Sequence, residues 1–275
     1  KERYIEWANQ QEYMPIYMKP WWLDAVCAGK EWDVLLSEDE NGVILGAMPF
    51  LLRKRAWLRY IIMPQQTPVG GIWVTPEITA DRWKTAEVCR QLKEQLDSLK
   101  LAYYYQQYLP GSLCVNAMKA LGFTAKERIT YRVEDLSNLD NVIASFSKNK
   151  RRQLQKALSL HAERNMDIED FYRFHCQCLA SRKRKISYSR EFLLVLERKA
   201  KRAGQCEILS ICNADGEVYA AAFLVWDKNY MYYLIPAYEP THGDTGAGAL
   251  LVLEAMKRAR EKQVMFDFEG SMNKG

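Results

Sequence analysis

Two acidic side chains near the end of the chain could act together as a base. Asp267 and Glu269 flank Phe268 in a segment that closes a strand expected over residues 264–268. Because side chains alternate along a strand, both carboxylates would lie on one face, with Phe266 and Phe268 on the other. Carboxylates that face a cleft can remove a proton from a nucleophile. The alternative is that one of them binds an Arg or Lys and has a structural role.

A glycine-rich loop just upstream could bind an anion. Gly243, Gly246 and Gly248 precede a helix expected over residues 247–261, and Thr245 adds a hydroxyl group. The N–H groups and the positive dipole end of a helix start attract phosphate, and glycine lets the phosphate approach closely. The sequence therefore predicts phosphate or pyrophosphate binding here. The alternative is a strand-to-helix loop in which glycines only allow the turn.

A second anion site is predicted at the start of a basic helix, for which Ser147 is the expected N-cap. The helix opens with four cations at the end where its dipole disfavours positive charge, so we expect an anionic partner. These cations are Lys148, Lys150, Arg151 and Arg152. Residues 145–203 hold 16 basic and 6 acidic residues, a net charge of +10 in a chain of net charge +5. The alternative is a solvated charged face. The basic run 182–185 could form the other wall of the site.

Aromatic residues give a weaker chemical signal. Tyr233, with Tyr230 and Tyr232 on a strand expected over residues 230–235, could protonate a leaving group or line an acyl channel. A tyrosine-rich strand also fits ordinary cross-strand packing. We expect core packing for most tryptophans, a group that includes Trp57.

The elements that must position these residues follow from hydrophobic period and turn signals. In the first half we expect helices over residues 20–27, 80–99 and 112–121. We expect strands over residues 32–37, 43–52, 101–109 and 128–133. In the second half we expect helices over 147–164, 168–181, 190–203 and 247–261, with strands over 207–212, 217–226, 230–235 and 264–268. The last strand, loop, helix and strand form a βαβ unit with parallel strands. Both halves share one order of elements, which indicates a topological repeat.

Other function classes are disfavoured by the composition. The longest apolar run spans nine residues, 218–226, so no membrane-spanning segment is expected. The seven cysteines lack metal-type spacing and the three histidines form no ligand pair, so we expect reduced thiols, a cytoplasmic location and no metal. The N-terminus lacks the apolar core of a signal peptide.

The second half resembles the GNAT N-acyltransferase fold, and the whole chain resembles the tandem-GNAT FemAB-like group, which includes BioF2-like acetyltransferase domains. The strings that carry the resemblance are DGEVYAAAFLVW at 215–226, GDTGAGALLVLEAM at 243–256 and FDFEGS at 266–271, with PWWLDAVC, WDVLL, GAMPF and MPQQTPVGG in the first half. The resemblance implies an α/β (α+β) chain of two GNAT-like domains, 1–137 and 138–275, with mixed, mostly antiparallel sheets. A GNAT domain is expected to continue beyond its fifth strand with a helix and one or two strands, so either a tail is missing from this sequence or the last domain is incomplete.

The resemblance implies transfer of an acetyl or aminoacyl group to an amine by direct attack. Acyl-CoA would lie over Gly246 and Gly248 with its carbonyl near the strand that contains Ile235, and the acceptor would be a small-molecule or peptide amine. A Fem-type aminoacyl-tRNA-dependent peptidyltransferase acting on a cell-wall precursor is the alternative. It is favoured because Gly243 occupies the usually basic position of the phosphate loop and because residues 145–203 are strongly basic. A non-catalytic binding protein on the same scaffold is the third possibility.

Overall fold

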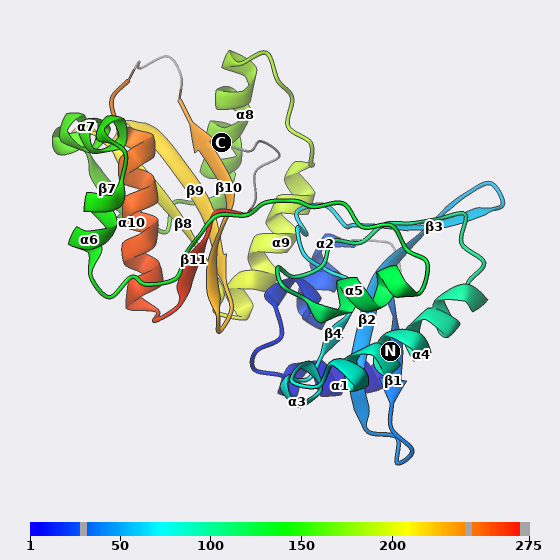
Figure 1. Cartoon of the computed structure of the whole chain (residues 1–275). Coiled ribbons are helices and arrows are strands. Elements are labelled where there is room, and N and C mark those ends of the chain that lie inside the picture. Colours follow the sequence, from blue (N-terminus) through cyan, green and yellow to red (C-terminus); the bar gives the residue numbers. More distant parts are fainter. Residues whose placement is uncertain (28–31, 240–243, 270–275) are drawn as a thin grey trace. The chain divides into compact units, whose positions relative to one another are not determined.

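The chain folds into two compact units, residues Lys1–Glu127 and Arg128–Gly275. The computed structural model describes residues 1–27, 32–239 and 244–269. Each unit contains one twisted sheet with helices packed on it (Figure 1). The division precedes the expected boundary at 137/138, and residues 132–133 already pair with the sheet of the second unit.

The sheet of the first unit has the strand order β1-β2-β3-β5, with β4 paired to β2. The elements of this unit are α1 (Glu2–Gln10), α2 (Pro20–Val26), β1 (Trp32–Glu38), β2 (Ile44–Arg55), β3 (Leu58–Ile62), β4 (Trp73–Val74), α3 (Pro76–Thr79), α4 (Arg82–Ser98), β5 (Tyr103–Tyr104) and α5 (Leu113–Ala120). The predicted Asn-Gly hairpin joins β1 to β2, where Gly42 has φ +79°. The helix α1 and the strand β3 were not expected, and the strand expected over 101–109 is only two residues long.

The sheet of the second unit has the strand order β6-β11-β10-β9-β8-β7. Its elements are β6 (Arg132–Val133), α6 (Leu139–Ser145), α7 (Lys148–Lys156), β7 (His161–Arg164), α8 (Ile168–Ser181), α9 (Arg190–Arg202), β8 (Cys206–Cys212), β9 (Val218–Trp226), β10 (Tyr230–Tyr238), α10 (Ala247–Glu261) and β11 (Met265–Asp267). Strands β10 and β11 are parallel, as the predicted βαβ unit requires. In the first unit β3 and β5 are also parallel and follow an antiparallel run, so the predicted topological repeat is present.

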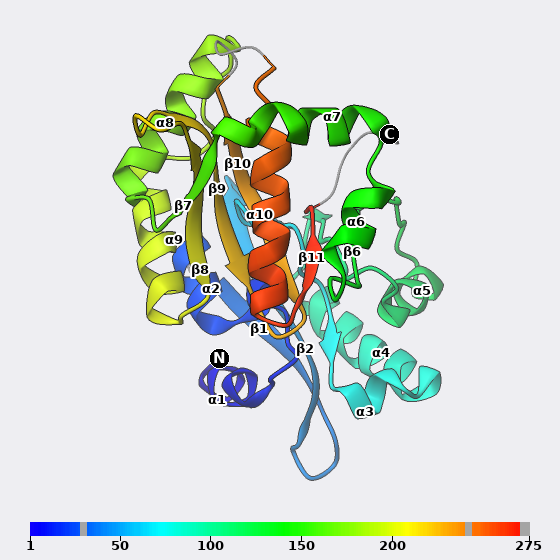
Figure 2. The same cartoon turned by 90° about the vertical axis from the view of Figure 1, so that its left-hand side faces the viewer.

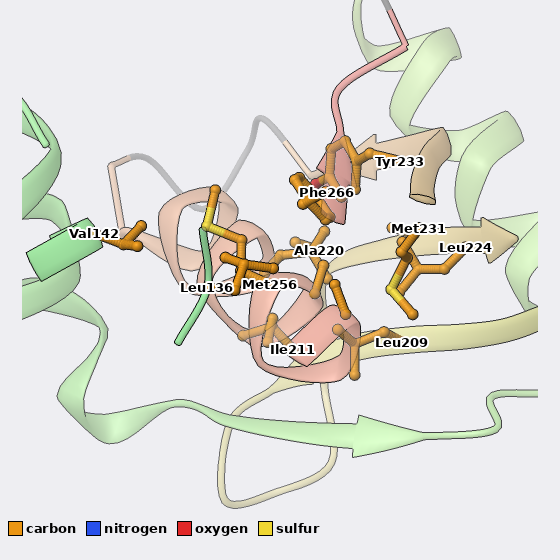
Figure 3. Packing of buried hydrophobic residues seen from close by; sticks show 14 of the residues in the cluster. Leu136, Val142, Leu209, Ile211, Ala220, Leu224, Met231, Tyr233, Met256 and Phe266 are labelled. Carbon is orange, nitrogen blue, oxygen red and sulfur yellow. The ribbon is translucent and has the colours of Figure 1, made fainter. Parts of the chain in front are cut away.

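Helices cover both faces of the second sheet, with α10 on one face and α8 and α9 on the other (Figures 1 and 2). The face under α10 buries alternate residues of β9, Ala220, Ala222 and Leu224, against Leu251 and Met256 of the helix (Figure 3). The opposite face of β9 presents Phe223, whose ring lies 6.5 Å from that of Phe171 on α8. This alternation is the one expected of a strand buried on both faces.

Three sequence predictions need correction in this unit. The basic helix α7 ends at Lys156, followed by a 3₁₀ turn and by β7, instead of continuing to residue 164. Leu158, which a helix continued to residue 164 would place on its apolar face, is 79% exposed. The last strand ends at Asp267, because Glu269 has φ +63° and leaves the extended conformation. Alternation therefore does not extend from Asp267 to Glu269.

Candidate active site

A cavity of about 640 Å³ lies at the N-terminal end of α10. Its walls come from the start of α10, from α7, from the ends of β9 and β10 and from Phe268 after β11. Residues Thr245 to Ala249 and Val252 and Met256 line it along the helix, and Phe146, Ser147, Lys150 and Gln153 line it from the segment around α7. Arg182, Tyr219, Tyr238, Glu239, Asp244 and Phe268 complete the wall. The cavity is charged at the end where α10 begins and apolar farther along the helix.

The cavity exists because β10 extends beyond its parallel neighbour β11. Pairing of β10 with β11 covers only Tyr230 to Tyr232, whereas β10 continues to Tyr238. Beyond this point the sheet no longer fills the space beside β10, and α10 starts there after the connecting loop. Parallel strands that separate at their carboxyl ends commonly leave room for a ligand in open α/β sheets.

Two glycines of the loop are required by close packing. Gly246 has φ +78°, and a Cβ atom on it would lie 1.9 Å from the carbonyl oxygen of Gln153 in α7. A Cβ atom on Gly248 would lie 3.0 Å from the Tyr238 ring. Thr245 Oγ1 lies 3.4 Å from the N–H of Ala247 at the helix start. Gly243 lies outside the described residues. The loop borders the cavity, as an anion-binding loop would, and it also requires glycine for close packing. Both interpretations of the glycines are therefore compatible with the structure.

The acidic residue of the loop is neutralised by α7. Asp244 accepts hydrogen bonds from Lys156 Nζ at 2.8 Å and from Gln153 Nε2 at 3.3 Å. The bond from Lys156 is the main reason that the pKa of Asp244 is lowered. This pairing could not be predicted from local sequence patterns, because Asp244 and Lys156 are far apart in the chain. Asp244 is consequently a weaker obstacle to an anionic ligand than its charge suggests.

The four predicted cations of α7 separate into different roles. Ser147 is the N-cap, as predicted, and accepts a hydrogen bond from the N–H of Lys150. Lys150 lines the cavity. Arg151 donates to the carbonyl oxygens of Ala144 and Phe146, at 2.6 and 2.7 Å, and so closes the end of α6.

The other two cations, Lys148 and Arg152, are exposed and do not line the cavity. Arg182, from the basic run suggested as a second wall, does line it and donates to the Tyr238 carbonyl oxygen at 3.3 Å. Lys150 and Arg182 are therefore the two cations that reach the cavity among the described residues.

A β-bulge brings Tyr233 and Tyr238 to the same face of the sheet. Residues five apart on a regular strand face opposite sides. In β10, Tyr232 pairs with Val225 and Ile235 with Phe223, so one extra residue is inserted and the alternation changes phase. The hydroxyl oxygens of Tyr233 and Tyr238 are 2.6 Å apart. Ile235, a predicted cofactor contact, pairs with Phe223 and so lies on the opposite face.

The bulge also joins the two phenol hydroxyls in one hydrogen bond. Tyr233 lies beside Phe266 and Phe268, and its hydroxyl shares this bond with Tyr238. Either hydroxyl can donate in it. Burial raises the pKa of both phenols, and this bond raises the pKa of Tyr233 further but offsets part of the rise for Tyr238. Tyr238 lines the cavity, so when Tyr233 donates in this bond, the proton of Tyr238 can be donated to a ligand.

Asp267 occupies a closed network. Its Oδ2 accepts from Arg132 Nε at 2.7 Å, and its Oδ1 accepts from Thr130 Oγ1 at 2.5 Å and from the N–H of Glu269 at 2.8 Å. Arg132 also lies over the Tyr230 ring, 4.1 Å from its centroid. The network ties β6 to β11, which is the structural alternative that the sequence left open. Asp267 does not line the cavity.

Glu269 follows Phe268, which lines the cavity, but Glu269 is not itself among the described residues that line it. Its side chain is half-buried, and burial raises its pKa well above the ordinary value. A raised pKa is what a carboxylate needs to hold or release a proton near neutral pH. Tyr238 was not among the predicted site residues, and Arg182 was suggested only as part of a second wall. The bulge and the fold place both at the cavity.

Comparisons with known proteins agree on the fold. A family model described as acetyltransferase (GNAT) domain matches residues 144–273. No curated protein matches. The solved structure of FemX covers 100% of this chain and 88% of its own, with 14% identity and a TM-score of 0.71. A tandem GNAT protein from the clavulanic acid biosynthesis pathway (99% and 88% covered, 14% identity, TM-score 0.51) and L-PGS from Bacillus licheniformis (98% and 75%, 10% identity, TM-score 0.55) are also similar. The chain therefore has the mixed α/β, GNAT-like fold seen in tandem GNAT proteins, and its second unit is similar to the GNAT acetyltransferase domain over residues 144–273.

Proposed function

We propose that the second unit is an N-acyltransferase that holds its acyl donor in the cavity at the start of α10. The observation that carries the proposal is the cavity itself, which combines a helix N-terminus, two cations and an apolar extension within one GNAT domain. Such a cavity suits a donor with an anionic part and an apolar arm. The acceptor would be an amine, attacking the donor carbonyl directly. A cytoplasmic location fits the cysteines, none of which forms a disulfide within the described residues.

Acyl-CoA is the donor that we infer first. The residues fit its phosphates, because Lys150 and Arg182 lie on the wall and Lys156 neutralises Asp244. Thr245, Gly246 and Gly248 would border the phosphates at the helix start, and Gly243 stays a proposed contact from the sequence alone. In this arrangement the donor supplies the activated carbonyl, and the chain's own residues orient it and move protons.

Two groups would handle the protons. Glu269, with its raised pKa, would accept the proton of the attacking amine. Tyr238, oriented by Tyr233, would donate a hydrogen bond to the oxygen or the leaving atom of the acyl donor. Asp267 would hold Arg132, β6 and the turn to Glu269 in place, which is a positioning role.

The affinity for acetyl-CoA tests the proposal. Lys150→Gln should weaken acetyl-CoA binding by about tenfold or more, since a charge-assisted contact is removed. Lys148→Gln is the matched control, because Lys148 lies on the same helix without lining the cavity. Titration calorimetry measures both. Equal affinities for the two variants would remove acyl-CoA from this cavity.

A second candidate, aminoacyl-tRNA as donor, is favoured by the cations that lie outside the cavity. Lys148 and Arg152 are exposed on α7, and the run 182–185 continues beyond Arg182. These positions suit a long phosphate backbone better than a single cofactor. Binding of charged tRNA that weakens steeply with salt, together with no binding of acetyl-CoA at millimolar concentration, would select this donor.

The hydroxyl of Tyr238 provides a separate prediction. Tyr238→Phe should lower turnover about tenfold, because one hydrogen bond to the reacting donor is lost while the ring still packs on Gly248. Tyr219→Phe is the control, since Tyr219 also lines the cavity but its hydroxyl donates to Glu217. Steady-state kinetics with saturating donor measures the effect. Unchanged turnover in Tyr238→Phe would show that the phenol only packs.

A further inference from the structure

The hairpin between β2 and β3 has a composition that the proposed function does not use. Strand β2 ends at Arg55 and β3 begins at Leu58, so Ala56 and Trp57 form the turn. Ala56 has φ +53°. Beyond the pairing of Tyr60 with Tyr103 of β5, the hairpin is a two-stranded ribbon, and Figure 1 shows it extending outward near the label β3.

The tip of this ribbon exposes apolar side chains. Trp57 is 87% exposed and Leu58 is 46% exposed. Core packing, expected for Trp57 from the sequence, is wrong at this position. Exposing neighbouring large apolar residues to water is unfavourable, and such patches commonly mark a contact surface. The tip is therefore suited to leave water when the protein meets an apolar phase.

Cations surround the apolar tip. Arg53, Lys54 and Arg55 precede it and Arg59 follows it, while no acidic residue occurs from position 41 to position 76. None of these four cations forms an ion pair within the described part of the chain. The charge of the tip is consequently uncompensated and complementary to an anionic surface.

The side chains are arranged in layers behind the tip. Arg55 pairs with Leu58, and two residues farther back Arg53 pairs with Tyr60, which pairs in turn with Tyr103 on β5. At a strand rise of about 3.4 Å per residue, this second row lies about 7 Å behind the first. Trp57 and Leu58 thus stand at the tip with Arg55 beside them, and Arg53 and Tyr60 lie about 7 Å behind, so an apolar tip flanked by cations could meet both the acyl chains and the headgroups of a bilayer.

We propose that this hairpin docks the first unit on a bilayer that contains anionic lipids. Trp57 and Leu58 would enter the interface, and Arg53, Lys54, Arg55 and Arg59 would contact the lipid phosphates. A nucleic acid could stack one base on Trp57, but such stacking leaves Leu58 in water. The proposal does not depend on acyl transfer by the second unit.

Vesicle flotation tests the docking. The full chain should float with vesicles of two parts phosphatidylcholine and one part phosphatidylglycerol, and should not float with phosphatidylcholine alone. Trp57→Ala combined with Leu58→Ser should reduce the bound fraction by about tenfold or more, given the apolar area removed. Replacing Arg53, Lys54 and Arg55 with Gln should abolish the preference for the anionic vesicles.

Trp83→Ala is the matched control, because Trp83 is 79% exposed on α4 of the same unit. It should float like the parent protein. All variants should keep the parental circular dichroism spectrum, since the altered side chains lie outside the core. Equal flotation of the parent and the Trp57, Leu58 variant would overturn the proposal. Hairpin-dependent binding of tRNA without any vesicle binding would overturn it in favour of a nucleic acid.

Discussion

Asp267→Asn should lower the free energy of unfolding by about 3 kcal/mol, because it breaks a buried ion pair and leaves the Arg132 cation without its partner. The side chains of Asp267 and Arg132 are only 5% and 18% exposed, so water can replace little of the lost interaction. The loss should also loosen β6 from β11 and disturb the turn that leads to Glu269. Urea unfolding followed by circular dichroism measures the change.

Asp170→Asn provides the comparison, since Asp170 forms an exposed ion pair with Arg173 in the same unit. Exposed pairs contribute about 0–1 kcal/mol, so this variant should unfold almost like the parent. If Asp267→Asn unfolded like the parent and yet lost its turnover, Asp267 would act on the substrate, and the structural assignment would be wrong.

Glu269→Gln should reduce turnover about 100-fold or more if Glu269 removes the amine proton. The carboxylate must be ionised to accept a proton, and burial raises its pKa, so the parent's turnover should increase as pH rises through that raised pKa. The Gln variant should lose this limb of the pH profile, because it has no group to ionise. Turnover measured across the neutral and mildly alkaline range tests both statements.

The stability of the Glu269→Gln variant provides a control, because it should not fall with the turnover. A folded-state pKa above the unfolded value means that the folded chain binds the proton more tightly, so stability is greatest below the unfolded pKa and falls as pH rises toward the folded one. Gln resembles the protonated form, so the variant should be at least as stable as the parent at neutral pH. A less active variant that is not less stable would exclude misfolding, whereas unchanged turnover would remove Glu269 from the role of base.

The sequence was most informative where local patterns decide the structure. Turn residues and hydrophobic period predicted the β1–β2 hairpin, the meander from β8 to β10 and the parallel βαβ unit, and Ser147 signalled the start of α7. Helix α7 was predicted too long because residues 157–161 continue its hydrophobic period. In the structure, residues 157–159 form a 3₁₀ turn and residues 161–164 pair with β8 as β7.

The site depended on contacts between distant residues, which local patterns do not contain. The glycine loop was found, but its packing on Gln153 and the pairing of Asp244 with Lys156 join segments about ninety positions apart. Among four similar cations, only the fold distinguishes Lys150, which lines the cavity, from Arg151, which caps α6. The conformation of Glu269 after β11 was likewise invisible to the rule of alternation.

The bulge in β10 has a consequence for how such a site can arise. Without the extra residue between Tyr232 and Ile235, Tyr238 would face away from Tyr233 and from the cavity. Gaining or losing a single codon in this strand would therefore join or separate the two phenols while every other side chain kept its identity. In a lineage of such proteins, the length of this strand would record the presence of the tyrosine pair more faithfully than the tyrosines themselves.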